Sequence, residues 1–202
     1  MRPVMSLEAS GTVVLVEGES DRFAVEALAR RLDIDLVAAG ATVVSMGGVT
    51  NMHHHLAVLA RDPVRRRVLG LFDVGEVAYV RGAVDEAGLG PADADLESLG
   101  FFACVPDLEG ELIRALGSAR VEELLAEHGE LARFRGFQQQ PAQRTKAVDA
   151  QLRRFMGTHA GRKARFAPIL VQALEEPRIP AALSSLLAAA VGTPGVATSR
   201  DE

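Results

Sequence analysis

The sequence contains few cysteines and few aromatic residues, which limits the kinds of cross-link, metal site and core that the chain can form. The single cysteine, Cys104, excludes an internal disulfide and a cysteine-based zinc site. Aromatic residues make up 4% of the 202 residues and hydrophobic residues 48%. We therefore expect a sizeable core built mainly from Leu, Val and Ala, as in α/β proteins.

Long apolar runs are also missing. No run approaches the ~20 residues that span a bilayer, and the N-terminus lacks the basic-then-apolar pattern of a signal peptide. These absences predict a cytoplasmic protein without a membrane partner.

Charge is distributed unevenly along the chain, whose formal net charge is −5. Residues 1–132 carry 11 Lys or Arg against 22 Asp or Glu, a net charge of −11. Residues 133–166 carry nine basic residues and one acid, a net charge of +8. An acidic body with a basic segment is typical of a metal site beside a phosphate-binding surface. A basic helix face that meets only solvent would give the same pattern.

Short apolar runs alternate with helical patterns in the first half of the chain. The runs predict strands at 12–16, 42–46, 68–72 and 101–105. The helical patterns predict helices at 20–32, 51–60, 76–87 and 107–116, and Ser20 is expected to cap the first of them. This alternation predicts a Rossmann-like parallel sheet with helices on both faces, whose chemistry lies at the carboxyl ends of the strands.

The second half of the chain has a different character. Amphipathic or apolar helices are predicted there at 119–134, 142–156, 162–175 and 181–191. We therefore divide the chain into an α/β domain at 1–118, a helical extension at 119–191 and a disordered tail at 192–202.

Carboxylates stand at three of the four predicted strand ends, where Glu17, Asp73 and Asp107 occur. Neighbouring carboxylates repel one another, and a Mg²⁺ ion removes that repulsion. Asp21 can point back toward Glu17, and Glu17 can also act as a general acid or base. Each acid has a plainer interpretation as a helix cap or first-turn charge. The candidate metal ligands are Glu17, Asp21, Asp73, Glu76, Asp107 and Glu109.

Two groups of cationic or histidine residues complete the candidates. The Gly-Arg-Lys-Ala-Arg segment at 161–165 could stabilise a transferring phosphoryl group or form a solvated basic face. Three consecutive histidines, at 53–55, point in different directions on a helix and cannot all bind one ion. No Walker A motif is present. The candidates for binding nucleic-acid phosphates are Arg144, Lys146, Arg153, Arg154, Arg162 and Arg165.

Three motifs together resemble the Toprim domain: Val-Glu-Gly-Glu-Ser-Asp at 16–21, Gly-Gly-Val-Thr-Asn at 47–51 and Leu-Phe-Asp at 71–73. Asp-Leu-Glu at 107–109 and Gly-Arg-Lys at 161–163 make the chain most similar to nucleases of the overcoming-lysogenization-defect (OLD) family. The resemblance covers about residues 11–116.

The resemblance implies a phosphodiesterase that uses Mg²⁺ or Mn²⁺. It implies that Glu17 and Asp21 contribute to metal binding, with Glu17 also catalytic, and that Asp73 is a principal ligand. Glu109, with Asp107, would complete a second metal position, and Lys163 would stabilise the transition state.

Two departures from the family pattern bear on this hypothesis. The usual Asp-x-Asp is Asp73-Val74-Gly75 here, so the second aspartate is missing, although Glu76 could substitute for it. The family also usually carries an N-terminal ATPase domain, so control by ATP would need a separate ATPase partner. We predict a DNA endonuclease, with a nucleic-acid-binding or regulatory module that does not cleave as the alternative. Nucleotidyl transfer ranks last, since no template-binding or zinc element is evident.

Overall fold

A four-stranded parallel sheet organises the computed structural model, which describes residues 11–91, 93–159 and 161–192. Its strand order is β2-β1-β3-β4, with Val16 of β1 opposite Leu71 of β3 and Asp73 of β3 opposite Cys104 of β4. The strands are β1 (Thr12–Val16), β2 (Ala41–Ser45), β3 (Arg67–Asp73) and β4 (Phe101–Cys104). The predicted parallel α/β fold is therefore confirmed.

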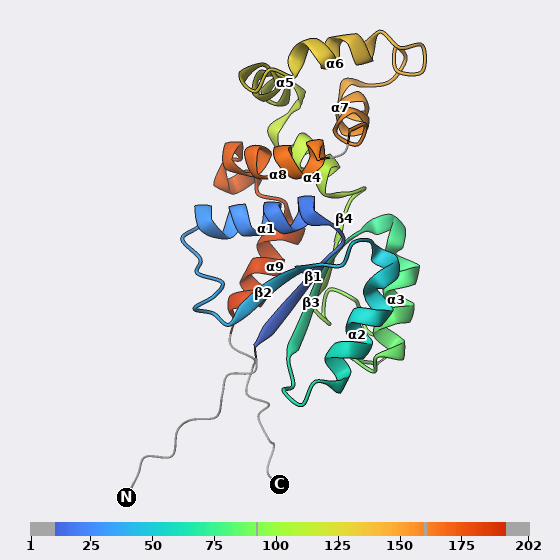
Figure 1. Ribbon diagram of the computed structural model, residues 1–202, viewed down its shortest axis with the longest axis vertical. Coiled ribbons are helices and arrows are strands. Elements are labelled where there is room, and N and C mark those ends of the chain that lie inside the picture. The colour runs from blue at the N-terminus through green and yellow to red at the C-terminus, as the bar shows by residue number, and fades with distance from the viewer. Residues whose placement is uncertain (1–10, 92, 160, 193–202) are drawn as a thin grey trace, which may run out of the picture.

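Helices cover both faces of the sheet, as Figure 1 shows. Alternate side chains of β1 face opposite ways. Val14 and Val16 join the apolar cluster on one face, and Val13 and Leu15 join the cluster on the other. The first face is covered by α1 (Glu19–Arg31) and α9 (Ala181–Val191), and the second by α2 (Met52–Arg61) and α3 (Val77–Glu86). Short 3₁₀ turns, η1 (Val49–Asn51) and η2 (Val74–Glu76), lead into α2 and α3.

The second half of the chain leaves the sheet and returns to it. Between β4 and α9 the described residues form α4 (Leu108–Leu116), α5 (Ser118–Glu127), α6 (Leu131–Gln138), α7 (Val148–Met156) and α8 (Arg162–Ala173). A 3₁₀ turn, η3 (Glu176–Arg178), precedes α9.

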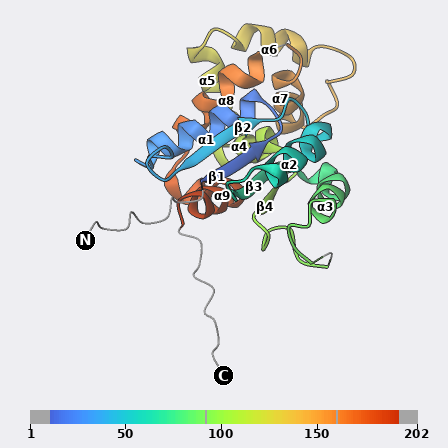
Figure 2. The ribbon, with the colours of Figure 1, turned by 60° about the horizontal axis from the view of Figure 1, so that its bottom comes forward.

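Figures 1 and 2 show α5, α6 and α7 stacked beyond the sheet, while α8 lies beside α1. Nη1 of Arg31 donates a hydrogen bond of 2.7 Å to the carbonyl of Val171, which ties the end of α1 to α8. One apolar cluster runs from Val14 to Ala190, so the extension shares its core with the sheet. The domain boundary near residue 118 stays a prediction. Every helix in the described ranges is too short or too polar to cross a bilayer.

Three details of the predicted elements were wrong. The single helix expected at 119–134 is two helices, α5 and α6, because Gly129 adopts a left-handed φ of 73° between them. The helix expected from residue 142 begins only at Val148. Ser20 lies inside α1 and does not cap it; Gly18 is the N-cap, and its N–H donates to the carboxylate of Asp21 at 2.8 Å. All of the predicted tail except residue 192 lies outside the described residues.

Candidate functional site

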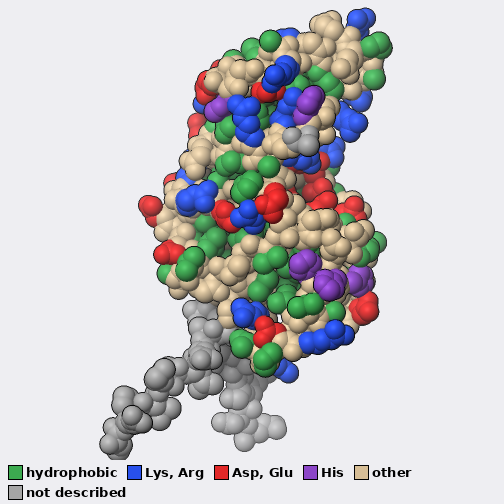
Figure 3. All heavy atoms as spheres, viewed as in Figure 1, with side chains coloured by type: hydrophobic (Ala, Val, Ile, Leu, Met, Phe, Trp, Pro, Cys, Tyr) green, Lys and Arg blue, Asp and Glu red, His purple; other side chains and the backbone are tan. Residues whose placement is uncertain are grey.

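The carboxyl ends of three neighbouring strands meet at one edge of the sheet. Glu17 follows β1 directly, and Asp73 ends β3, its neighbour in the sheet. Asp107 and Glu109 follow β4, and Asp21 lies in the first turn of α1. We call these five residues the acidic rim. Figure 3 shows acidic side chains where the sheet-bearing part of the molecule meets the upper helices, with basic side chains above them.

The electrostatics of the acidic rim indicate that its carboxylates lie within mutual range. Burial raises the pKa of Asp73 to about 7, and the charges of Glu17 and Asp107 add to that rise. Burial also raises the pKa of Asp21 to about 7, opposed by the Gly18 hydrogen bond and reinforced by the charges of Glu109 and Glu17. The pKa values of Asp73 and Asp21 thus respond to the charges of acids that follow β1 and β4.

Lys163 of α8 reaches the acidic rim. Its Nζ lies 2.9 Å from Oε2 of Glu109, whose side chain is only 5% exposed. Burial alone would lower the pKa of Lys163, but the charge and hydrogen bond of Glu109 outweigh it and raise the pKa. Lys163 is therefore a charged ammonium at neutral pH. The other oxygen of Glu109, Oε1, is buried and has no hydrogen-bond partner.

Asp107 is held at both of its carboxylate oxygens. Oδ1 accepts a 2.7 Å hydrogen bond from the N–H of Gly110 and so caps α4. Oδ2 accepts from Nε of Arg153 on α7. A metal-binding role for Asp107 stays a prediction, and it would require the Arg153 contact to open.

The comparisons with known proteins fit this geometry. Residues 10–74 match the family model described as "Overcoming lysogenization defect protein-like, TOPRIM domain", a stretch that holds Glu17, Asp21 and Asp73. Over this stretch the chain is similar to an OLD-like Toprim domain. No curated protein sequence matches the chain.

The similarity to solved structures extends beyond residues 10–74. One is the C-terminal region of the OLD protein of Xanthomonas campestris pv. campestris, with a TM-score of 0.63 and 27% identity, covering 89% of this chain and 94% of that one. Another is the C-terminal region of the Burkholderia pseudomallei OLD protein, with a TM-score of 0.64, covering 91% of this chain and 98% of that one. Its 21% identity supports the fold alone.

Gly75 and Glu76 follow Asp73 in the 3₁₀ turn η2. Burial raises the pKa of Glu17, and the charge of Glu76 is the next largest cause, so Glu76 lies near the acidic rim. Gly75 stands in open space, since a Cβ atom added there would meet no heavy atom within 4 Å. The position of the family's missing aspartate is therefore empty of competing side chains.

The carboxylate oxygens of the acidic rim are of the kind that bind a divalent cation. Carboxylate oxygens are the ligands that Mg²⁺ prefers, and the unpartnered Oε1 of Glu109 and the raised pKa values of Asp21 and Asp73 suit such an ion. Among the described residues, however, no three His, Cys, Asp or Glu side chains are grouped closely enough to hold one ion. In addition, Lys163 and Arg153 donate hydrogen bonds to one oxygen each of Glu109 and Asp107. The donor chemistry fits a metal, and side-chain rotation would be needed to gather the ligands.

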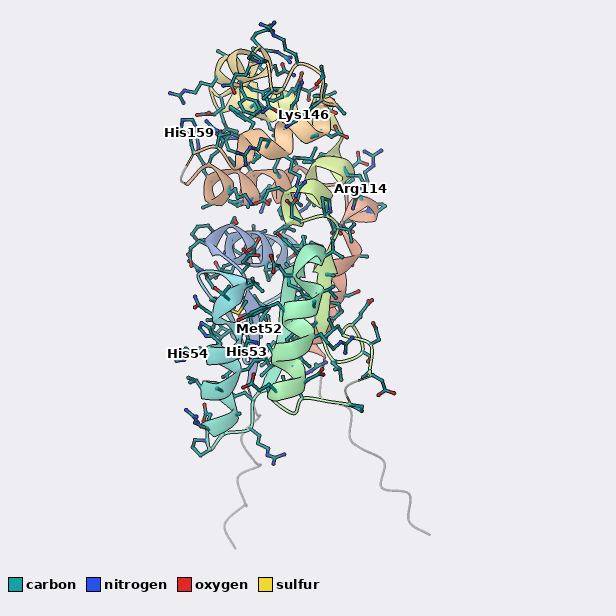
Figure 4. The ribbon with its side chains drawn as sticks, turned by 90° about the vertical axis from the view of Figure 1, so that its right-hand side faces the viewer. Met52, His53, His54, Arg114, Lys146 and His159 are labelled. Atoms are coloured by element: carbon teal, nitrogen blue, oxygen red, sulfur yellow. The ribbon has the colours of Figure 1, made fainter. Side chains whose placement is uncertain are left out.

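The predicted nucleic-acid-binding residues divide into accessible and inaccessible ones. Arg144, Lys146, Arg154 and Arg165 are exposed, and Figure 4 places Lys146, which lies between α6 and α7, in the upper part of the molecule. Arg153 is also exposed but already paired with Asp107. The prediction for Arg162 was wrong.

Arg162 is buried because it faces into the helical extension. Its side chain is 6% exposed, and it donates to the carbonyl of Phe155 at 2.7 Å and to Glu130 at 3.1 Å. Glu130 is itself buried and also pairs with Arg133 at 2.6 Å. Arg162 therefore joins α6, α7 and α8 and cannot contact a ligand phosphate in this arrangement.

The three histidines on α2 diverge. Nδ1 of His53 lies 2.8 Å from Oε2 of Glu86 on α3, and its ring meets Tyr79 edge-on at 5.0 Å. The rings of His54 and His55 are 6.0 Å apart. Figure 3 shows histidine side chains gathered on this face, and Figure 4 shows His53 and His54 on α2.

Sequence analysis did not single out Glu111. It is 8% exposed, and its Oε1 accepts a 2.9 Å hydrogen bond from the N–H of Val105. A signal was available, because Glu111 shares a helix face with Leu108, Leu112 and Ala115. A carboxylate in an apolar stripe is costly to bury, so it indicates a specific partner.

Proposed function

We propose that this Toprim protein is a Mg²⁺- or Mn²⁺-dependent nuclease that hydrolyses phosphodiester bonds of DNA. One observation carries the proposal. Glu17, Asp73 and Asp107 stand at or just beyond the ends of three neighbouring strands, and the ammonium of Lys163 hydrogen-bonds Glu109. The OLD-like Toprim domain supports a role connected with nucleic acid.

Each residue of the proposed centre has a distinct role. Glu17, Asp21, Asp73 and Glu109 would hold the metal, which when bound neutralises charge on the phosphate and activates water. Lys163 would donate from Nζ to a phosphoryl oxygen as negative charge develops there. Glu17, whose pKa is raised, is placed to accept or return a proton.

The exposed arginines and lysine of the helical extension would bind the DNA backbone. Arg144, Lys146, Arg154 and Arg165 supply positive charge beyond the acidic rim. This arrangement would place the scissile phosphate against the carboxylates and the flanking phosphates against the upper helices. A separate ATPase partner remains part of the proposal, and cleavage by the purified chain without ATP would show that the partner is dispensable.

A second candidate function is a nucleic-acid-binding module that does not cleave. Three observations favour it: the glycine at position 75, the cations that pair with Asp107 and Glu109, and the absence of a grouped three-ligand set in the described part of the chain. The two candidates differ in whether metal leads to bond cleavage.

Nicking of supercoiled plasmid by the purified chain in Mn²⁺ separates them. We expect wild type to nick, Asp73→Ala to nick at least about 100-fold more slowly, and Asp85→Ala to match wild type. Asp85 is a suitable control because it is an exposed acid on α3 that does not belong to the acidic rim. Binding of DNA without nicking by wild type would support the module instead.

A further inference from the structure

Val105 leaves the sheet with both of its backbone polar groups bound by side chains of α4. Pairing between β3 and β4 ends at Asp73 opposite Cys104, so Val105 lies beyond the ladder. Oε1 of Glu111 accepts from the N–H of Val105 at 2.9 Å. Nη1 of Arg114 donates to the carbonyl of Val105, also at 2.9 Å. Figure 4 shows Arg114 at the surface, at the level where α4 leaves the sheet.

The position of the Glu111 carboxylate is unfavourable for the stability of the fold. Its side chain is 10% exposed, its Oε2 is buried without a hydrogen-bond partner, and Arg114 approaches its Oε1 only to 3.7 Å. Burying an incompletely paired carboxylate destabilises a fold. An uncharged residue would suit the apolar face of α4 better, so the hydrogen bond to Val105 is the feature that distinguishes Glu111 from an apolar side chain.

Two of the residues between Val105 and Glu111 belong to the acidic rim. Asp107 caps α4, and Glu109 bonds Lys163 from the first turn of the same helix. The direction of that first turn depends on how the chain passes from β4 into α4. Glu111 and Arg114 lie one and two turns into α4. Because both hold Val105, they fix the start of the connection from β4 to α4.

We propose that Glu111 and Arg114 are positioning residues, which hold Val105 so that the β4–α4 connection presents Glu109 to the acidic rim. This inference rests on the proposed function, because the site that is positioned is the proposed metal centre. Neither residue touches the reacting phosphate; they act through the backbone of Val105.

The test compares Glu111→Gln, Glu111→Ala and Arg114→Ala, with Glu123→Ala as the control. Glutamine keeps an oxygen that can accept from Val105, and alanine does not. Glu123 forms an Arg–Glu pair at the same i,i+3 spacing, with Arg120 on α5, and is 62% exposed. Three quantities are measured: the Mn²⁺ Kd by calorimetry, kcat and KM for plasmid nicking, and hydrogen exchange of the 104–112 peptide without metal.

We expect Glu111→Ala to raise the Mn²⁺ Kd and lower kcat by about tenfold each, with KM for DNA little changed. Exchange of the 104–112 peptide should accelerate in the same variant. Arg114→Ala should show the same pattern at about threefold, because water can replace the guanidinium at the exposed carbonyl. Glu111→Gln and Glu123→Ala should match wild type in all three measurements.

Two results would overturn the inference. Wild-type Mn²⁺ affinity and kcat in a folded Glu111→Ala would show that Val105 needs no anchoring. A Glu111→Gln variant as impaired as Glu111→Ala would show that the charge, and not the hydrogen bond, matters. If wild type neither binds Mn²⁺ nor nicks DNA, the proposed function fails. Unchanged exchange in Glu111→Ala would then also reject the anchoring, and accelerated exchange would support it.

Discussion

Nζ of Lys163 lies 2.9 Å from Oε2 of Glu109, although 54 residues separate the two in the chain. The contact joins the first turn of α8 to the first turn of α4. A helix of the extension therefore supplies the cation at an otherwise acidic edge of the sheet. The same cation competes for the carboxylate that a metal would use.

Replacing Lys163 separates these two effects. Lys163→Met removes the ammonium and keeps a similar length, so we expect nicking to slow by about 100-fold or more because a charge-stabilising donor is lost. Mn²⁺ should bind severalfold more tightly, since Glu109 is released and a nearby positive charge is gone. Calorimetry and single-turnover nicking measure the two quantities. Arg120→Met, which removes an Arg of similar exposure from α5, should change neither. A parallel loss of affinity and rate would contradict the competition.

Restoring the family's second aspartate should strengthen the metal site. Gly75→Asp adds a carboxylate next to Asp73 in a position with no neighbouring atom to clash. We expect the Mn²⁺ Kd to fall by about tenfold, because affinity for hard cations rises with the number of charged ligands. Gly82→Asp is the matched control, since Gly82 on α3 is equally unobstructed. Equal Mn²⁺ affinities in the two variants would place residue 75 outside the site.

Metal should stabilise the fold more at alkaline than at acidic pH. Asp21 and Asp73 have pKa values of about 7 in the fold, against an ordinary value of 3.8. The folded state therefore binds more protons than the unfolded chain between about pH 4 and pH 7, and their contribution to stability falls as pH rises through that window. Mn²⁺ requires the ionised carboxylates and would offset this loss.

Thermal melting with and without Mn²⁺ measures this linkage. At about a hundredfold excess of Mn²⁺ over Kd, we expect Tm to rise by about 5–10 °C at pH 8. The rise should be much smaller at pH 5.5. Asp73→Asn should reduce both the rise and its dependence on pH, while KCl at matched ionic strength should reproduce neither. An equal rise at both pH values in wild type would contradict the assignment of these acids.

The buried Glu130–Arg162 pair should be a major source of stability in the helical extension. Glu130→Ala leaves the Arg162 guanidinium buried without its carboxylate, and we expect a loss of about 3 kcal/mol in the free energy of unfolding. Urea denaturation measures the change. Glu122→Ala removes the half-buried partner of Arg135, whose own side chain is exposed, and should cost less than about 1 kcal/mol. Similar costs for the two variants would show that Arg162 needs no counter-charge.

Sequence patterning located the strands and the edge that carries the acids. Each predicted strand agrees with the structure to within one residue at either end, because continuous β-branched and apolar runs suit buried parallel strands. Once the strands are parallel, residues that follow them must share an edge. The positions of Glu17 and Asp73 could therefore be predicted without any knowledge of side-chain contacts.

Side-chain partnerships were harder to predict. The pairing of Asp107 with Arg153 and the burial of Arg162 depend on how α7 and α8 fold back, which local periodicity does not encode. The apolar spacing of the helical extension also continues past Gly129, which hid the break between α5 and α6. The charge distribution predicts one basic surface at residues 133–166, but Arg162 is buried and Arg153 pairs with Asp107.

The parallel packing of α1 and α8 has a consequence for control at a distance. Asp21 and Lys163 lie in the first turns of these helices, and Arg31 and Val171 join them near their far ends. The two helices therefore run parallel, and the hydrogen bond that joins them lies about 12 Å along α8 from Lys163. A shift of α8 along α1 would therefore change the spacing of Asp21 and Lys163, and the hydrogen bond between Arg31 and Val171 opposes such a shift.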